Sequence, residues 1–367
     1  MKIALLAGAS TIHTIRWVNS LAQLGHTVYL ITQHPCIEAC DQRVSVYSSP
    51  YRSTAGYFLM VPRVRRLLRR LSPDVLNAHY ASGYATTARM AGYRPWLLSV
   101  WGSDVYDFPE KSLLHRWWVR RNLLAADKVA STSTCMARQT RSLAPELGEI
   151  AVIPFGVDTR RFSAQPRASG KRSGQPQIVI GTVKKLAYKY GIDILILAFA
   201  RLREDLLASD PDTAQRLRLH IVGDGPDLQK LRQLASDNHI SQVTSFTGRV
   251  PHERVPEELA RMDVYAALSR LDSESFGVAV IEASAARCPV VVSDAGGLPE
   301  VVLHGQTGLV VPRGSPEAAA AALRKLIQDP GLRAHMGQAG QAHVQRHYDW
   351  RESVRTMLNV LQATAQG

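Results

Sequence analysis

The sequence predicts an α/β protein built from two doubly wound domains, each with a parallel sheet. The chain has 367 residues, about two to three times the length of an ordinary domain. Strand, turn and helix patterns alternate along it, and a segment rich in Pro, Gly, Ser and cations (QPRASGKRSGQPQ, residues 165–177) interrupts them. Hydrophobic residues make up 46% and charged residues 20%, which excludes a disordered chain.

The first half opens with a pattern of strand, turn, helix and strand at residues 3–7, 8–11, 14–24 and 28–32. This order builds a parallel sheet with right-handed crossovers. A signal peptide is not expected, because the short apolar run leads into a patterned helix without a cleavage region. Further strands are expected near residues 75–78, 96–100, 128–131 and 150–153.

After the break the pattern restarts, which indicates a second parallel α/β domain. We expect helices at 192–203 and 228–238, and strands at 178–182, 218–222, 243–246, 264–267 and 290–293. The predicted division is a first domain at 1–165, a linker at 166–177 and a second domain at 178–348, with a C-terminal helix at 349–365 that packs back on the first domain. Ligands of open parallel sheets bind beyond the carboxyl ends of the strands, so a ligand cleft is expected where the two domains face each other.

The positive charge of the chain is concentrated in its first half. The net charge is +13, with 20 basic against 10 acidic side chains in residues 1–165 and 24 against 21 in residues 166–367. This asymmetry favours an anionic partner such as nucleic acid, phospholipid headgroups or a diphosphate-bearing substrate. No nucleic-acid-binding motif is present, so nucleic acid is not an expected partner.

Two cationic stretches of the first half also contain regularly spaced apolar residues. A helix with a cationic face and an apolar edge can lie on an anionic bilayer, although a merely solvated face is the alternative. No apolar stretch approaches the ~20 residues needed to span a bilayer. Four cysteines in so long a chain fit a reducing compartment, so the expected location is the cytoplasm, with possible peripheral contact with the inner face of the membrane. The stretches are Arg63, Arg65, Arg66, Arg69 and Arg70, and residues 115–121 (HRWWVRR).

The segment most informative about chemistry is residues 272–311. Glu274 and Glu282 bracket seven residues, and Ser275-Phe276-Gly277 precede an amphipathic helical run. The backbone N–H groups of Phe276, Gly277 and Val278 would be available to hydroxyls or phosphate at the start of this helix. Glu282, one or two turns into the helix, suits a vicinal diol such as ribose, because an ionised carboxylate can accept two hydrogen bonds. The alternative is that both glutamates are surface charges.

Several motifs in a fixed order resemble the donor-binding signature of retaining glycosyltransferases of family four, which have the GT-B fold. The resemblance covers nearly the whole chain. It rests on residues 153–158 (IPFGVD) with Phe162, 222–226 (VGDGP), 246–250 (FTGRV) and 296–300 (GGLPE), followed by Gly305, Thr307 and Gly308.

The resemblance implies how a nucleotide sugar would be held. Glu274 and the amides of Phe276 and Gly277 would hold the donor hexose, and Glu282 the ribose hydroxyls. The turns at Gly223 and at Arg249-Val250 would lie near the nucleotide, the second facing its base.

The diphosphate needs cations, which GTVKKLAYKYG (residues 181–191) supplies. It resembles the family loop with two departures: lysine replaces the usual arginine, and Tyr190 separates Lys189 from Gly191. Lys185 and Lys189 are the expected contacts, and Lys184 is the alternative register; a solvated basic loop is the remaining interpretation. No metal ion or other cofactor is expected, and Asp210-Pro211-Asp212 is interpreted as a turn.

In the first domain, the loop with Gly8, Ser10 and His13 is expected to meet donor phosphate or acceptor, although His13 could simply start the helix. Asp104 and His79 follow predicted strands, and they are the first and second candidates for orienting or deprotonating the acceptor hydroxyl. For each, a structural hydrogen-bonding role is equally open. Trp101 stands where family members often have a histidine near the reacting sugar, so that contact is not carried over.

The expected function is transfer of a hexose-type sugar from a nucleoside-diphosphate donor to an acceptor hydroxyl with retention of configuration, in bacterial glycan or lipid-linked saccharide synthesis. A saccharide or a lipid-linked molecule is the expected acceptor. The alternatives are a catalytically silent homologue that binds nucleotide sugar and a GT-B-like nucleotide-sugar epimerase. The sequence leaves the base, the sugar and the acceptor open.

Overall fold

The protein forms two compact units in the computed structural model, which describes residues 1–163, 171–172 and 175–367. The first unit comprises residues 1–154 and 351–367, and the second comprises residues 155–350. The division thus falls before the predicted boundary at 165. Of the predicted linker, residues 166–170 and 173–174 lie outside the described residues, and the rest includes a short antiparallel pair, β8 (Lys171–Arg172) and β9 (Gln175–Pro176).

The first unit is built on a parallel sheet of seven strands in the order β3-β2-β1-β4-β5-β6-β7. Its central strands are almost completely buried, because helices cover both faces. The strand β3 lies at an edge, and most of its side chains are exposed. The strands are β1 (Lys2–Leu6), β2 (Thr27–Thr32), β3 (Val44–Ser48), β4 (Val75–His79), β5 (Trp96–Ser99), β6 (Lys128–Ser131) and β7 (Ile150–Val152).

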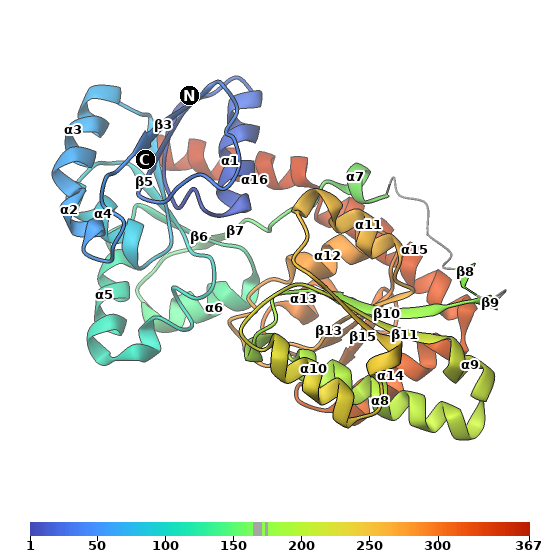
Figure 1. The fold of residues 1–367 in the computed structure, drawn as a ribbon. Coiled ribbons are helices and arrows are strands. Elements are labelled where there is room, and N and C mark those ends of the chain that lie inside the picture. The colour runs from blue at the N-terminus through green and yellow to red at the C-terminus, as the bar shows by residue number, and fades with distance from the viewer. Residues whose placement is uncertain (164–170, 173–174) are drawn as a thin grey trace. The chain divides into compact units, whose positions relative to one another are not determined.

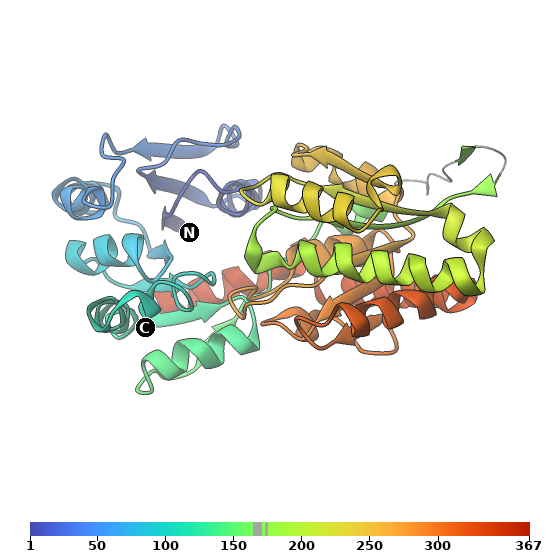
Figure 2. The same ribbon diagram turned by 60° about the horizontal axis from the view of Figure 1, so that its bottom comes forward.

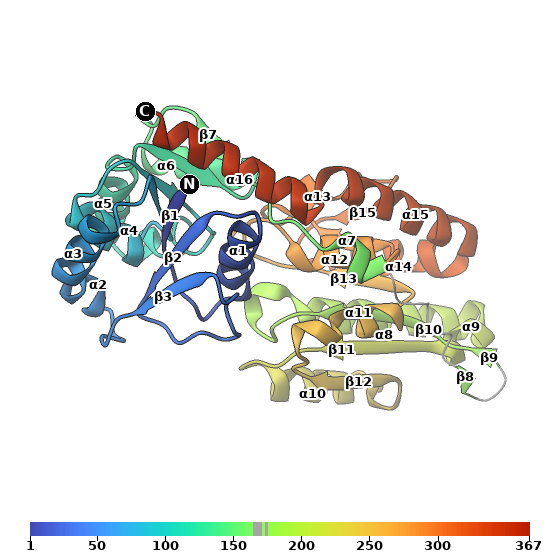
Figure 3. The same cartoon turned by 90° about the horizontal axis from the view of Figure 1, so that it is seen from above.

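The helices of the first unit start and end at recognisable capping residues. Thr11 caps the first helix by accepting a hydrogen bond from the Thr14 amide, and Ser133 caps α6 in the same way. Helices α2 to α5 lie along one side of the sheet and α1 along the other (Figure 3). The helices are α1 (Ile12–Gln23), α2 (Gly56–Leu59), α3 (Val61–Leu71), α4 (Gly83–Ala91), α5 (Leu113–Leu123), α6 (Thr134–Leu143) and α16 (Trp350–Ala365).

The second unit repeats this design with a parallel sheet of six strands in the order β12-β11-β10-β13-β14-β15 (Figure 1). Its apolar core lies between the sheet and helices that include α8 and α14, which run side by side (Figure 2). The strands are β10 (Ile178–Val183), β11 (Leu217–Val222), β12 (Thr244–Gly248), β13 (Val264–Ala267), β14 (Val290–Ser293) and β15 (Gly308–Val311).

The helices of the second unit cover both faces of its sheet. Asp210 does not sit in an isolated turn: its side chain caps a short helix by accepting a hydrogen bond from the Thr213 amide. The helices are α7 (Thr159–Ser163), α8 (Ile192–Ser209), α9 (Pro211–Arg216), α10 (Leu228–Asp237), α11 (Val255–Ala260), α12 (Val278–Ala285), α13 (Leu298–Val301), α14 (Pro316–Gln328) and α15 (Pro330–His347).

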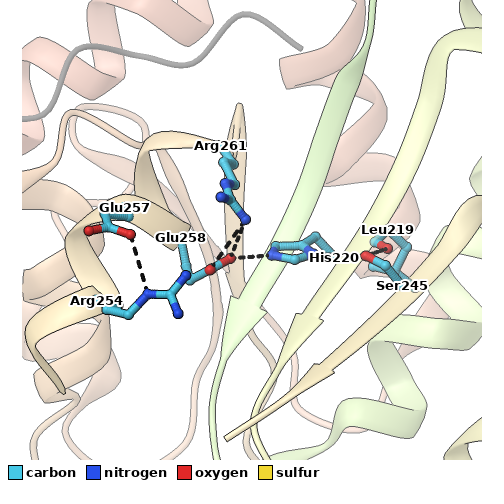
Figure 4. A network of polar contacts seen from close by, with 7 residues as sticks. All are labelled: Leu219, His220, Ser245, Arg254, Glu257, Glu258 and Arg261. Carbon is cyan, nitrogen blue, oxygen red and sulfur yellow. Dashed lines mark hydrogen bonds and ion pairs between the residues drawn. The ribbon is translucent and has the colours of Figure 1, made fainter. Parts of the chain in front are cut away.

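A polar network fastens the short helix α11 to the sheet (Figure 4). Glu258 on α11 is 1% exposed, and its carboxylate accepts hydrogen bonds from His220 on β11 (2.8 Å) and from Arg261 (3.3 Å). The other ring nitrogen of His220 lies 2.8 Å from the Ser245 hydroxyl on β12. A buried carboxylate is tolerated only when it is paired in this way, so the network fixes α11 against the sheet.

These observations confirm the predicted fold class, because both units are doubly wound parallel α/β folds. Among the helices of the described residues, none combines the length and the apolar character that crossing a bilayer would require.

Candidate functional site

In the second unit, the loop that precedes α12 is locked by close backbone contacts. The Gly297 amide donates to the Glu274 carbonyl (2.9 Å). A Cβ on Gly296 would collide with that carbonyl, and a Cβ on Gly297 would collide with the Ser275 carbonyl. The two glycines therefore let the turn before α13 lie directly against the loop that carries Glu274.

Glu274 forms an ion pair with Lys184, which follows β10. The Lys184 ammonium donates to the Glu274 carboxylate at 2.9 Å, and the two side chains are 14% and 8% exposed. Burial alone would lower the pKa of Lys184, but the Glu274 carboxylate and the neighbouring tyrosines outweigh it, so the pKa lies above its usual value. Lys184 is therefore charged near neutral pH, and the pair lies at the carboxyl end of the central strand.

The three lysines that the sequence suggested for the diphosphate differ in their contacts and exposure. Lys184 is directed to Glu274, and the Lys189 ammonium donates to the Ser273 carbonyl at 2.7 Å, one residue before Glu274. Both ammonium groups also lie over the Tyr190 ring, at 4.9 and 5.5 Å from its centre. Lys185 is exposed on the same loop. Lys184 and Lys189 thus both contact the segment that carries Glu274.

Glu282 lies inside α12 and is 6% exposed. One of its carboxylate oxygens accepts a hydrogen bond from His252 Nε2 at 2.8 Å. His252 belongs to the short segment directly before α11. Sequence reasoning missed His252 because it lies outside the motifs; its position directly after the FTGRV turn was the available signal.

Tyr265 on β13 was also not among the site residues predicted from the sequence. Its hydroxyl donates to the Val183 carbonyl at 3.2 Å, just before Lys184. Burial, opposed by the Lys184 charge, raises the pKa of Tyr265 to about 12. Because it reads as an ordinary buried strand residue, no sequence signal marked it.

The glycine turns bring the loop of Lys184 close to the turn expected near the nucleotide. A Cβ on Gly223, whose φ is +142°, would collide with the Lys184 carbonyl. The Gly223 amide also donates to the Gly248 carbonyl at 2.8 Å. Arg249 and Val250 follow Gly248 directly in the sequence, so they begin next to this contact. Arg249 is exposed.

The residues at the start of α12 differ in which of their groups are available to a ligand. The Phe276 ring is buried against Phe155 and Tyr348, so only its backbone is available to a ligand. Gly277 caps the helix with φ of +95°, a conformation that favours glycine. The Val280 and Ile281 amides donate to the Gly277 carbonyl (2.9 and 3.3 Å), whereas the N–H groups of the half-buried Val278 and of Ala279 come too early in the helix to find an acceptor within it.

In the first unit, four aromatic side chains gather beyond the ends of β1, β4 and β5. The Trp101 ring contacts those of His79, Tyr80 and His13, with ring centres 4.5, 5.3 and 5.9 Å apart. Tyr80 has φ of +71°, a strained conformation for a residue other than glycine. His79 is fully buried, and neither of its ring nitrogens has a hydrogen-bond partner among the described residues. Burial lowers the pKa of His79 to about 3, so its ring is neutral.

Asp104 is 1% exposed, and its carboxylate is hydrogen-bonded to backbone amides. One carboxylate oxygen accepts from the Ala81 amide (2.7 Å), and the other accepts from the amides of Trp101 and Gly102 (3.1 and 2.9 Å). Burial raises the pKa of Asp104, although these hydrogen bonds oppose the shift. The arrangement joins the turns after β4 and β5, which corresponds to the structural role left open for Asp104.

The first loop is anchored to its neighbours. The Ala9 amide donates to the Thr32 hydroxyl (3.2 Å), and the Ile37 amide donates to the Ala9 carbonyl (3.1 Å). Gly8 is buried, whereas Ser10 is exposed and His13 is half-buried against Trp101. Within the part of the chain that the structure describes, no three His, Cys, Asp or Glu side chains gather as metal ligands would.

Solved structures resemble this fold over nearly its whole length. Sucrose-phosphate synthase from Thermosynechococcus elongatus superposes with a TM-score of 0.81 at 19% identity, covering 98% of each chain. Anabaena HepE, solved in complex with UDP and glucose, superposes with a TM-score of 0.78 at 19% identity, covering 99% of each chain.

Sequence comparisons identify the family. The family described as glycosyl transferases group 1 matches residues 164–343, and the one described as glycosyl transferase 4-like matches residues 2–133. Two GDP-mannose-dependent α-(1-6)-phosphatidylinositol monomannoside mannosyltransferases are similar. The Mycolicibacterium smegmatis protein is 37% identical over 60% of this chain and 59% of its own length, so the match spans less than two thirds of that relative. The Mycobacterium tuberculosis protein is 33% identical over 72% of this chain and 69% of its own length. The chain belongs to the group 1, family-four-like glycosyltransferases with the GT-B fold.

Proposed function

We propose that this protein transfers a hexose-type sugar from a nucleoside-diphosphate donor to an acceptor hydroxyl. The observation that carries the proposal is the pair of buried glutamates flanking the start of α12, each held by a basic side chain. Glu274 and the amides of residues 276–278 would bind the hexose, and the Glu282 oxygen not bonded to His252 would accept hydrogen bonds from the ribose hydroxyls. Carboxylates suit these roles because charge-assisted hydrogen bonds to hydroxyls are strong.

The diphosphate would be neutralised by Lys184 and Lys189, with Lys185 available nearby. Fixed cations stabilise the charge that develops on the departing diphosphate, so no metal ion or cofactor is part of the proposal. The departing diphosphate can itself assist the acceptor on the same face of the sugar, which leads to retention of configuration. A strong protein base is then unnecessary.

The acceptor would bind to the first unit. His79, neutral and without a hydrogen-bond partner among the described residues, is suited to meet an acceptor hydroxyl. Asp104 would position the two turns around it rather than take the proton, because both of its oxygens accept backbone hydrogen bonds. His13 and the Gly8–Ser10 loop would complete this side.

A lipid-linked acceptor in bacterial glycan synthesis fits best. The similar mycobacterial proteins are named for a phosphatidylinositol mannoside substrate. The arginines that α3 exposes offer contacts to an anionic membrane surface on the cytoplasmic side.

The test is a thermal-shift panel of UDP, GDP, ADP and their sugars, because a true ligand raises the apparent stability by mass action. Glu282→Ala should weaken donor binding about 30- to 150-fold, because the lost charge-assisted hydrogen bonds contribute roughly 2–3 kcal/mol to the binding free energy. Exchange of the exposed Glu317 on α14 for Ala is the matched control and should leave binding unchanged. Equal donor affinity in wild type and Glu282→Ala would refute the assignment.

Product analysis separates the alternatives. Transfer to an added glycolipid, with the anomeric configuration read by NMR, supports a retaining transferase. Donor binding without turnover would indicate a silent homologue, and an inverted sugar centre on free nucleotide sugar would indicate an epimerase.

A further inference from the structure

The first unit contains an apolar pocket of about 430 Å³ that the proposed chemistry does not use. Its walls come from α2, α4, α5 and the segment before α5, all on the side of the sheet where the cationic helix α3 lies (Figure 3). The apolar part of the lining consists of Tyr57, Phe58, Phe108, Leu114 and Trp118.

Two of the polar side chains in the lining, Thr86 and Trp118, are already engaged within the protein. The Trp118 indole N–H donates to the Thr86 hydroxyl at 2.7 Å, and that hydroxyl donates to the Ser82 carbonyl at 2.5 Å. The Thr86 oxygen also accepts from Asn122 at 2.9 Å. Because the walls are largely aromatic, a hydrocarbon chain would displace water from them.

The mouth of the pocket continues into an exposed apolar rim. Leu113 and Leu114, at the start of α5, are 87% and 65% exposed. Phe58, Leu59 and Trp117 are also exposed, and Phe58 and Leu114 line the pocket itself. Several large apolar side chains gathered at one place on a surface mark an interaction site.

Cations surround this rim and lie directly on its aromatic rings. Lys111 lies 5.4 Å from the centre of the Phe108 ring, Arg121 lies 5.3 Å from that of Trp117, and Arg89 lies 5.3 Å from that of Trp118. Helix α5 carries three arginines and no acidic residue, and α3 exposes five more arginines. Two of the α5 arginines have acidic partners, Arg116 with Glu110 and Arg120 with Glu146. The surface around the apolar patch nevertheless keeps an excess of positive charge, which is complementary to a bilayer that contains anionic lipids.

We propose that the start of α5 inserts into an anionic lipid bilayer and that the pocket takes one hydrocarbon chain of a membrane lipid. The inference deepens the proposed function, since it rests on an acceptor that is lipid-linked. Leu113, Leu114 and Trp117 enter the acyl region, and the surrounding cations contact the phosphates. The contact brings the first unit to the surface where such an acceptor resides.

Flotation with vesicles tests the insertion. Wild-type protein should float at low salt with vesicles of phosphatidylcholine and phosphatidylglycerol, and much less with phosphatidylcholine alone. Leu113→Asp should weaken the partitioning at least about tenfold, because a leucine side chain is lost from the apolar phase. Leu24→Asp, on the opposite side of the same unit and 58% exposed, is the matched control and should float like wild type. Absence of flotation, or an equal effect of the two aspartates, overturns the proposal.

Quenching by brominated acyl chains tests the pocket. Phosphatidylglycerol vesicles with brominated chains should quench the fluorescence of Trp118 in the pocket wall, and Trp118→Phe should remove a large part of the quenching. Thr54→Phe narrows the pocket from its exposed side and should reduce the quenching about twofold or more, whereas Thr54→Ser should not. Unchanged quenching in Trp118→Phe and Thr54→Phe overturns occupancy of the pocket.

Donor binding, measured by thermal shift without vesicles, should be the same in all these variants. Loss of flotation with intact donor binding therefore refutes the membrane inference alone. Lack of donor binding in the wild type refutes the proposed function instead.

Discussion

The two units share one architecture but place opposite chemistry at the carboxyl ends of their strands. In the second unit, this edge carries the ion pair of Lys184 with Glu274 and the hydrogen-bonded pair of His252 with Glu282. In the first unit, the same edge carries the aromatic cluster around Trp101, with His79 neutral and Asp104 bound by backbone amides.

The difference teaches that the fold fixes where a ligand binds, while the side chains at the strand ends decide which ligand it is. A charged edge suits a nucleoside diphosphate, whose phosphates need cations and whose hydroxyls need strong acceptors. A neutral aromatic edge suits a sugar or polyol, which offers hydroxyls and apolar ring faces.

The largest expected effect comes from breaking the ion pair of the second unit. Lys184→Met leaves the buried Glu274 carboxylate without its partner and should lower the free energy of unfolding by about 3 kcal/mol. Lys185→Met, one residue away and exposed, should change it by less than about 0.5 kcal/mol. Chemical denaturation measures both. The double variant Lys184→Met with Glu274→Gln should recover much of the loss; if it does not, the pair is not what stabilises the loop.

The second expected effect is a dependence of the free energy of unfolding on pH, caused by His79 in the first unit. The pKa of His79 is about 3 in the folded protein and 6.5 for an ordinary histidine, so its contribution to folding is complete above pH 6.5 and is lost as the pH falls toward 3. Between pH 7 and 4.5, this one group should lower the free energy of unfolding by about 2.5 kcal/mol. His79→Asn, which cannot be protonated in this range, should show a correspondingly shallower pH dependence. Parallel curves for both proteins would mean that His79 is not buried as described.

A third experiment distinguishes the structural from the catalytic interpretation of Asp104. Asp104→Asn replaces charge-assisted hydrogen bonds from three amides and should lower the free energy of unfolding by about 2 kcal/mol. Thermal or chemical unfolding measures this loss. An unchanged stability together with a large fall in kcat would instead identify Asp104 as the catalytic base.

The smallest effect tests whether His252 positions Glu282. His252→Ala should weaken donor binding about three- to tenfold, because a net hydrogen bond contributes about 1 kcal/mol. His252→Gln, which keeps an N–H donor, should restore most of the affinity. Calorimetry with the preferred donor measures both. Tighter binding in His252→Ala would show that His252 competes with the ribose for Glu282.

Most strands were predictable because each is a short apolar run between turns. Three match the predicted bounds to the residue: β6, β13 and β14. The edge strand β3 was missed because most of its side chains face solvent, so it lacks the apolar signal of a buried strand. Helix α15 was missed for a related reason: its glycines, histidines and glutamines give it almost no amphipathic pattern.

The candidate site was predictable only where a motif specifies it. Glu274, Glu282 and the glycine turns were singled out because they match the family motif, and the structure brings Glu274 together with a lysine. Which lysine approaches Glu274 depends on how the backbone turns after β10, and the sequence carries no signal for that pairing. His252 depends on a contact between residues far apart in the sequence, which periodicity does not report.

The course of the chain has a consequence for how this protein is made. The first unit is interrupted in sequence: its last helix, α16, returns to it only after the whole second unit has been synthesised. During translation, residues 1–154 therefore lack the packing of Val354, Met357 and Leu361, three α16 side chains that are buried in the complete protein. The second unit can fold on the ribosome while the first is still incomplete, so truncation near the C-terminus should damage the half of the molecule that was translated first.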